Sequence, residues 1–307
     1  MKRVIYRIFK TKIVFVELSG GLGNQIFLLE AAKFLASLDN RVILLNDFHI
    51  DRKHSQGRST VKDFVLPYNV KFISLSRYIS ILLVHTKKYL KRFNKINQKQ
   101  LLTLTENESN SGKDAIMQII DNKRPKVIWL TDFWQNFSYW CNDLKYDLIN
   151  KSTRYEQLTS QMAKTDPIIV HYRLGRINND WEHSWGALSP KYIDEALKHS
   201  EHVSNRANLR VWIFSNDLEH ARYLIENFRF KVNYNFEFID DTGMSPAEVM
   251  KLFSECKFFI CSNSTFGLAA ARIGGVPNVF VPSELSYRGA IEMAFPNDWT
   301  KIESTWL

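Results

Sequence analysis

Residues 12–25, KIVFVELSGGLGNQ, carry the pattern that decides the fold. The β-branched and aromatic side chains in the first half are typical of a β-strand, and the glycines that follow indicate a tight turn. A run of helical character continues from 25 to 38, and a second apolar run lies at 41–45. Strand, glycine turn, helix and strand in this order predict the opening of a βαβ unit.

A second alternation of strands and helices starts after Pro167 and supports the same fold class. We predict strands at 168–173, 210–215, 236–239, 257–261 and 278–281, and helices from 189 onward and at 217–228, 246–255 and 264–273. The chain is therefore predicted to be an α/β protein of two consecutive halves, residues 1–160 and 161–307, with a break near 155–166.

The composition excludes a disordered protein, because 45% of the 307 residues are hydrophobic and only 24% are charged. The net charge of +9 is concentrated: residues 1–12 and 71–99 hold 13 of the 41 Lys and Arg residues and no acidic residue. This confinement argues against a nucleic-acid-binding protein. Segment 71–99 predicts either a solvated basic helix face or contact with an anionic membrane surface.

The few cysteines and the lack of long apolar runs indicate in which cellular compartment the protein is found. Cys141, Cys256 and Cys261 cannot all pair, which favours a reducing environment. No apolar run approaches the roughly 20 residues that a bilayer span needs. We therefore expect a cytoplasmic protein, with 71–99 as a candidate attachment to the inner membrane face. No CxxC, HExxH or D-x-D motif occurs, so we expect no metal site.

The candidate ligand-binding residues lie in turns that follow predicted strands, where open α/β sheets bind ligands. Glycines let a backbone approach a ligand closely, and the N–H groups at a helix start attract anions. Alternation along a strand places His171 and Arg173 on one face, and the guanidinium offers a diphosphate paired donors and a permanent charge. The candidates are Gly21, Gly23, Asn24, His171, Arg173, Asn216, Asp217, Asn263, Ser264, Thr265 and Phe266.

Each of these motifs also has a purely structural interpretation. Residues 20–25 could form only a tight turn, His171 could cap the sheet, and Arg173 could belong to a surface ion pair. Residues 216–217 could serve only to cap a helix, whereas the four small polar residues at 262–265 are more than one cap requires.

Taken in order, the motifs resemble those of the inverting fucosyltransferases that use GDP-fucose, most closely the bacterial α-1,2-fucosyltransferase family. The resemblance rests on GGLGNQ (20–25), DFWQNFSYW (132–140), HYRLGR (171–176), LSPKYI (188–193), FSND (214–217), CKFFICSNSTFG (256–267) and the pair Pro296 and Trp299. The HYRLG core is also similar to that of the protein O-fucosyltransferases. The sequence departs from the family pattern at Leu174, Arg176 and Gly267.

The resemblance implies a metal-independent GT-B enzyme, in which two Rossmann-like domains face a central cleft. It implies no cofactor, GDP-fucose as the donor substrate on the C-terminal domain, and a glycan acceptor, which a lipid could carry, on the N-terminal domain. The ligand-binding candidates given above would bind this donor. Arg173 would stabilise the leaving diphosphate, with His171 beside it and with the assistance of Asn24 and the helix start at 264–265. The candidate general bases are Asp180 and Glu182, and the candidate acceptor-binding residues are Asp47 and His54.

The implied product is an α-1,2-fucoside of a galactoside, made for a surface polysaccharide similar to an O-antigen. Three alternatives stay open: a different linkage, another GDP-sugar, and a nucleotide- or glycan-binding module without catalysis. The last alternative is suggested by Leu174 and Arg176, which stand where the family has an arginine and an aspartate.

Overall fold

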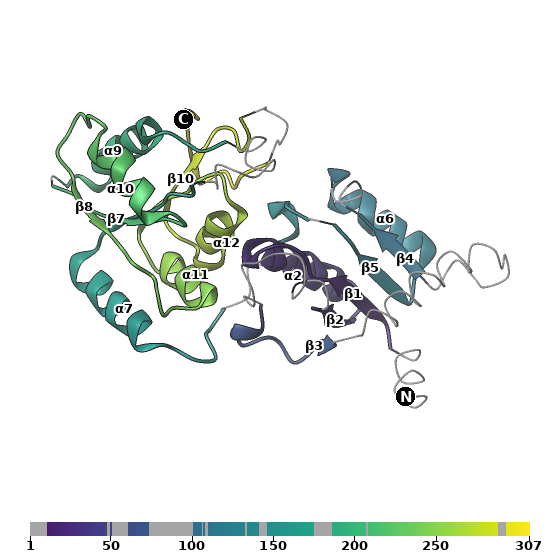
Figure 1. Ribbon diagram of the computed structural model, residues 1–307. Coiled ribbons are helices and arrows are strands. Elements are labelled where there is room, and N and C mark those ends of the chain that lie inside the picture. The colour runs from purple at the N-terminus through teal and green to yellow at the C-terminus, as the bar shows by residue number, and fades with distance from the viewer. Residues whose placement is uncertain are drawn as a thin grey trace. The chain divides into compact units, whose positions relative to one another are not determined.

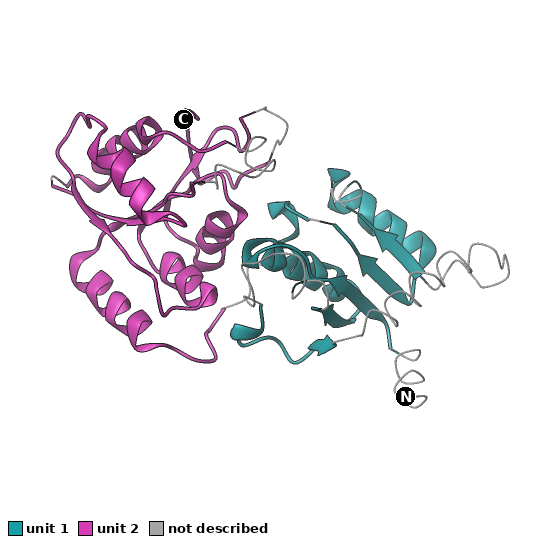
Figure 2. Cartoon of the chain, in the orientation of Figure 1, with its two compact units in different colours: residues 1–144 teal, residues 145–307 magenta. Residues whose placement is uncertain are grey.

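The computed structural model describes residues 11–47, 50, 61–73, 101–105, 107, 110–132, 134–140, 146–174, 186–206, 208–287 and 293–307. The chain forms two compact units, called here unit 1 (residues 1–144) and unit 2 (residues 145–307) (Figure 2). Each unit is built on a parallel sheet with helices packed against it (Figure 1). The prediction of an α/β chain with two Rossmann-like parts is confirmed.

Unit 1 contains a five-stranded parallel sheet in the order β3-β2-β1-β5-β4. Its strands are β1 (Ile13–Glu17), β2 (Val42–Asn46), β3 (Val70–Ile73), β4 (Leu101–Leu104) and β5 (Val127–Leu130). β1 occupies the centre because it is apolar on both faces. Phe15 packs edge-on against Trp129 on one face, with the ring centroids 5.2 Å apart, and Val14 and Val16 are fully buried.

Helix α2 (Leu22–Ser37) follows the glycine turn. It begins at Leu22 and not at residue 25 as predicted, because Gly21 takes the extended conformation of an N-cap and the next residues are already helical. Gly23 and Asn24 therefore belong to the first turn of the helix. Unit 1 also contains α6 (Lys113–Lys123) and the short 3-10 helices η1 (Val61–Asp63) and η2 (Phe137–Tyr139).

Unit 2 contains a six-stranded parallel sheet in the order β11-β10-β9-β6-β7-β8. Its strands are β6 (Ile168–His171), β7 (Arg210–Phe214), β8 (Asn235–Phe238), β9 (Phe258–Ile260), β10 (Asn278–Pro282) and β11 (Thr300–Ile302). The chain runs outward from β6 to β8 and then returns to the other side of β6 with β9. This is the strand order of the Rossmann fold, whose direction reverses between two neighbouring central strands.

Helices cover both faces of this sheet. They are α7 (Thr153–Thr165), α9 (Pro190–Ser204), α10 (Leu218–Glu226), α11 (Pro246–Ser254) and α12 (Thr265–Gly274). On one face, Tyr192 of α9 and Ile225 of α10 share a buried cluster with Val170 of β6. On the other face, Phe253 of α11 packs against Phe259 of β9, with the ring centroids 5.2 Å apart.

Residues 155–166 are not a break between domains, because they form most of α7. Ser152 caps this helix by accepting a hydrogen bond from the backbone N–H of Tyr155, and Tyr155, Leu158 and Met162 bury one face of it. The backbone N–H of Ser152 also donates to Glu248 of α11. The helix thus packs within unit 2, which begins at residue 145, and the boundary predicted at 160/161 cuts through it.

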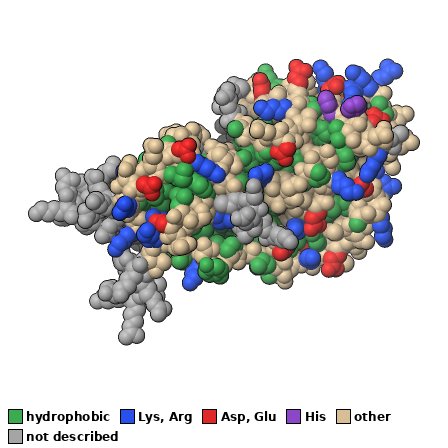
Figure 3. Space-filling view, turned by 180° about the vertical axis from the view of Figure 1, so that it is seen from behind, with side chains coloured by type: hydrophobic (Ala, Val, Ile, Leu, Met, Phe, Trp, Pro, Cys, Tyr) green, Lys and Arg blue, Asp and Glu red, His purple; other side chains and the backbone are tan. Residues whose placement is uncertain are grey.

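The basic segments lie almost entirely outside the described residues, so the predicted membrane contact through 71–99 stays a prediction. On the face shown in Figure 3, Lys and Arg side chains are interspersed with Asp and Glu. No helix in the described part of the chain has the length and apolar character needed to span a membrane. Cys256 and Cys261 are buried thiols, and Cys141 lies outside the described residues.

Candidate functional site

Two of the predicted motifs meet at the edge of the unit 2 sheet where its strand order reverses. Strands β6 and β9 are neighbours, with Val170 beside Ile260, so residues 171–173 and 261–264 leave the sheet side by side. Open α/β sheets bind ligands at this point, because the carboxyl ends of the strands and the N-termini of the helices both face the crevice there. The fold thus joins segments that lie 91 residues apart in the sequence.

Arg173 and Ser264 make the contact that defines the candidate site. The Arg173 Nη1 donates to the Ser264 Oγ at 3.2 Å, and Arg173 is an exposed residue. Ser264 is buried and occupies the N-cap of α12, yet its side chain makes no capping bond. The first turn of α12 holds no acidic residue. A guanidinium and a helix N-terminus therefore lie together, which makes the region attractive to an anion.

The side chains of 171 and 172 alternate as predicted. The His171 imidazole packs against Phe253 of α11 and Phe266 of α12, each with a centroid distance of 5.6 Å, whereas Tyr172 is buried on the opposite face. Burial, and then the neighbouring Arg173 guanidinium, lower the pKa of His171 to about 3. The ring is therefore uncharged at neutral pH, so it offers a ligand hydrogen bonds and no positive charge.

Asn216 and Asp217 make local bonds at the end of β7. The Asn216 Oδ1 accepts from the Leu174 N–H at 2.9 Å, and its Nδ2 donates to the Leu174 carbonyl oxygen. Asp217 caps α10 by accepting from the His220 N–H at 3.0 Å, as the structural interpretation proposed. Asn216 thus holds the backbone next to Arg173, and a donor contact by either side chain stays a prediction.

Asn263 and Leu174 have structural surroundings as well. The Asn263 Nδ2 donates to the carbonyl oxygens of Gly186 at 3.1 Å and Leu285 at 3.3 Å, which ties two loops to the end of β9. Leu174 is 1% exposed and belongs to the apolar cluster of α9 and α10. The residue at position 174 therefore faces the core, which gives a physical reason for leucine there. The next two predicted residues, Thr265 and Phe266, open α12 and are half-buried.

Unit 1 has its own reversal of strand order, between β1 and β5. Here the Asn24 Oδ1 accepts from the Gln135 Nε2 at 3.1 Å, which joins the glycine turn to the segment after β5. Gln25 is fully buried, and its amide donates to the Gly20 carbonyl oxygen at 3.0 Å and accepts from the Val61 N–H at 3.3 Å. Gln25 thus fixes the turn, while the exposed Gly21 opens α2 without any side-chain cap.

The remaining predicted site residues are less defined. Asp47 follows β2 and forms an ion pair with Lys62, so its carboxylate is neutralised within unit 1. His54, Asp180 and Glu182 lie outside the described residues, and their roles stay predictions. No group of three His, Cys, Asp or Glu side chains in the described ranges is arranged to hold a metal ion.

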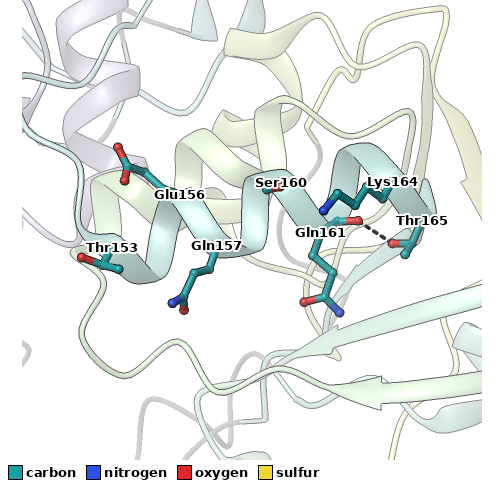
Figure 4. A pocket seen from close by; sticks show the side chains of 7 residues that line it. All are labelled: Thr153, Glu156, Gln157, Ser160, Gln161, Lys164 and Thr165. Carbon is teal, nitrogen blue, oxygen red and sulfur yellow. Dashed lines mark hydrogen bonds between the residues drawn. The ribbon is translucent and has the colours of Figure 1, made fainter.

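Two residues near these edges, Gln135 and Phe253, were not singled out from the sequence. Gln135 lies inside the DFWQNFSYW segment, whose position after a strand is a usable signal. Ser262, one of the four small polar residues at 262–265, precedes Asn263, and its Oγ lies 3.5 Å from the His171 Nδ1. Phe253 comes from α11, where nothing but helical burial distinguishes it. A separate hollow, lined by seven side chains of α7 from Thr153 to Thr165, contains none of the predicted site residues (Figure 4).

The comparisons with known proteins agree with this fold. A mutant of Arabidopsis thaliana FUT1 in complex with GDP is similar in structure at 13% identity and a TM-score of 0.52, covering 91% of this chain and 74% of that chain. The fucosyltransferase NodZ from Bradyrhizobium is similar at 12% identity and a TM-score of 0.51, covering 88% and 94%. The GT-B fold class is confirmed, while the predicted cleft between the units stays a prediction.

At the level of sequence, no curated protein matches the chain significantly. The model of glycosyl transferase family 11, in contrast, matches residues 13–303. This match spans both sheets and includes the glycine turn, the Arg173 segment and the start of α12. The protein therefore belongs to glycosyl transferase family 11.

Proposed function

We propose that the protein transfers L-fucose from GDP-β-L-fucose to a hydroxyl group of a glycan acceptor, with inversion at the anomeric carbon. The contact between Arg173 and the N-cap residue of α12 carries this proposal, because it provides an anion site where the sheet reverses its strand order. Membership of glycosyl transferase family 11 supports sugar transfer. A similar structure holds GDP, and NodZ, an α-1,6-fucosyltransferase, was co-crystallised with GDP, which supports a guanine nucleotide as the carrier.

The reaction would be a single displacement. The acceptor oxygen bonds to the anomeric carbon as the bond from that carbon to the β-phosphate oxygen breaks, and the electron pair of the broken bond stays on GDP. Negative charge grows on the β-phosphate, so donors fixed in advance lower the barrier. Arg173 supplies a permanent charge, and the N–H groups of α12 supply aligned dipoles. We expect these groups to be sufficient without a divalent cation.

The two units would divide the substrates between them. Unit 2 would bind the donor, with the uncharged His171 as a hydrogen-bonding partner of the diphosphate or the sugar. Unit 1 would take the acceptor, with Asp47 and His54 as contacts, and its Asn24 would assist Arg173 at the donor. The proton of the acceptor hydroxyl would go to a general base, for which Asp180 and Glu182 are the candidates.

We further propose a galactoside acceptor and an α-1,2 linkage, within the synthesis of a surface polysaccharide at the cytoplasmic face of the membrane. Segment 71–99, with eight basic and no acidic residues, would attract the protein to anionic lipid, where a lipid-linked acceptor would be found.

A donor screen tests the proposal. GDP-fucose, GDP-mannose and UDP-sugars are added to the full chain, and the melting temperature is measured. GDP-fucose at 100 times its dissociation constant should stabilise the protein by about 2.7 kcal/mol, whereas UDP-sugars should not stabilise it. Stabilisation by UDP-sugars alone would contradict the proposal.

A turnover assay then separates an enzyme from a binding module. With a galactoside present, GDP should be released and a fucosylated product formed, with EDTA leaving the rate unchanged. Donor binding without product over a panel of glycan acceptors would instead identify a nucleotide-binding module without catalysis.

A further inference from the structure

Gly267, the third residue of α12, lies directly against the imidazole of His171. A Cβ added to Gly267 would lie 2.8 Å from the His171 Nδ1, closer than non-bonded atoms of this kind approach, and 3.6 Å from the Phe259 Cζ, an ordinary contact. The backbone of Gly267 is helical, so its conformation places no demand for glycine. A side chain at position 267 would therefore clash with the imidazole ring.

The ring has neighbours from each element packed against it. Phe253 of α11 and Phe266 of α12 each lie 5.6 Å from it, with interplanar angles of 48° and 52°, and 5.9 Å from each other, so the three rings form one cluster. The Ser262 hydroxyl after β9 lies 3.5 Å from Nδ1. These neighbours carry no charge. Among the described residues, the guanidinium of Arg173 is the charged group that acts on the ring.

We propose that Gly267 is a positioning residue: its missing side chain lets the His171 imidazole pack against Phe253 and Phe266, beside the Arg173 that would bind the donor diphosphate. The part that concerns the donor rests on the proposed function. The part that concerns the ring rests on the packing of unit 2 alone.

The enclosure has a chemical consequence. Packed against the two aromatic rings and next to a cation, the imidazole stays uncharged, since burial and Arg173 both lower the pKa of His171. A methyl group at position 267 would rotate the ring out of this place toward solvent. The pKa of His171 would then rise toward the ordinary histidine range, and the ring would become charged in mildly acidic solution.

The ring position is tested by NMR on the free protein. The signals of His171, assigned by comparison with His171→Gln, are followed from pH 5 to pH 8 in the wild type and in Gly267→Ala. We expect no titration in the wild type and a titration within this interval in the variant. Titration in the wild type, or flat signals in both proteins, would overturn the proposal.

A double-mutant comparison supplies the matched control. Gly267→Ala should lower the melting temperature while the imidazole is present. In the His171→Ala background it should instead raise the melting temperature, because no ring opposes the methyl group and alanine is the better helix former. An equal loss of stability in both backgrounds would mean that the methyl group meets something other than the imidazole, and the assignment would fail.

GDP-fucose binding separates this inference from the proposed function. Both phosphates of this donor are esterified, so they do not titrate near neutrality as the terminal phosphate of GDP does. We expect a wild-type dissociation constant that is constant from pH 5.5 to pH 8. The Gly267→Ala protein should bind more weakly at pH 8 and regain affinity toward pH 5.5. If the dissociation constants of the two proteins changed with pH in parallel, Gly267 would have no role at the donor site. A wild type that binds no GDP-fucose would refute the proposed function, and the NMR result alone would then decide the ring position.

Discussion

The two units place a helix N-terminus at the same point of their folds, but they surround it differently. Both α2 and α12 begin without a side-chain cap and without an acidic residue in the first turn. In unit 2 the exposed Arg173 reaches the start of α12. In unit 1 the start of α2 has the amide pair of Asn24 and Gln135, and the nearby Asp47 is paired with Lys62. A helix dipole alone is a weak anion site, so the added permanent cation favours unit 2 as the proposed site of the diphosphate.

The largest effect is expected at Arg173. Replacement by alanine should lower kcat by 10²–10³, or about 3–4 kcal/mol in the barrier, because a charge-stabilising donor of the transition state is lost. Replacement by lysine should be almost as damaging, since the forked geometry is lost although the charge remains. Steady-state kinetics with GDP-fucose measure both, with Arg222→Ala on the surface of α10 as the control of normal rate. A lysine variant with near-normal turnover would remove Arg173 from this role.

A smaller loss is expected at Asn216, which holds the backbone of Leu174 through two hydrogen bonds. Alanine there should destabilise unit 2 by about 1–3 kcal/mol, because a half-buried N–H and carbonyl lose their partner. It should also weaken donor binding roughly tenfold, since each 1.4 kcal/mol of lost positioning is a factor of ten. Thermal denaturation and donor titration measure the two effects. Asn216→Asp keeps the bond from the Leu174 N–H, so it should fall between the wild type and alanine; equal damage by both variants would contradict this account.

A still smaller effect is expected in unit 1. Asn24→Ala removes one neutral hydrogen bond to Gln135 and the proposed substrate contact, and should cost about 1 kcal/mol in kcat/KM, or roughly fivefold. Gln135→Leu should give a similar loss, because Asn24 then has no fixed partner. The two variants are compared with Arg173→Ala in one assay. If Asn24→Ala proved more damaging than Arg173→Ala, the assignment of the diphosphate to unit 2 would be wrong.

The strands and the polar turns were predicted well from the sequence. β1, β6 and β9 are recognisable because each is an apolar run followed by a turn with glycine, arginine or serine. The sequence could not predict which turns meet, because that depends on the strand order, which places β9 beside β6 although β7 and β8 come between them in the chain. The sequence analysis also missed α7, because only three of its 13 residues, Tyr155, Leu158 and Met162, are buried and most of the others are polar.

Side-chain roles were harder to predict than positions. Asn216 and Arg173 look equally suited to a ligand in the sequence, yet the amide is engaged with the Leu174 backbone and the guanidinium lies at the exposed end of the sheet. The charge state of His171 was not evident either, since it depends on burial against Phe253 and Phe266, which lie on helices far from position 171 in the sequence. The local pattern names the chemical groups, and packing decides which of them face a ligand.

The smallest effect on turnover is expected at Glu248, a residue of α11 that belongs to none of the candidate site motifs. Its carboxylate accepts the backbone N–H of Ser245 at 2.6 Å in a capping box and also the N–H of Ser152, which joins α11 to α7. Burial acts to raise the pKa of Glu248, but these hydrogen bonds outweigh burial and hold the pKa below its usual range.

Because the pKa of Glu248 is lower in the folded state, the unfolded chain binds more protons as the pH falls through the interval between the two values. The stability that the carboxylate contributes is therefore present at neutral pH and lost in acid. Glu248→Gln should cost about 1 kcal/mol at pH 7 with unchanged kcat, and should converge with the wild type as the pH drops below the folded-state pKa. Denaturant titrations of both proteins across the acid range measure this difference. If the difference in unfolding free energy between the two proteins stayed constant with pH, the cap would act through its shape and not through its charge. A change in kcat would mean that the packing of α7 on α11 influences the proposed donor site.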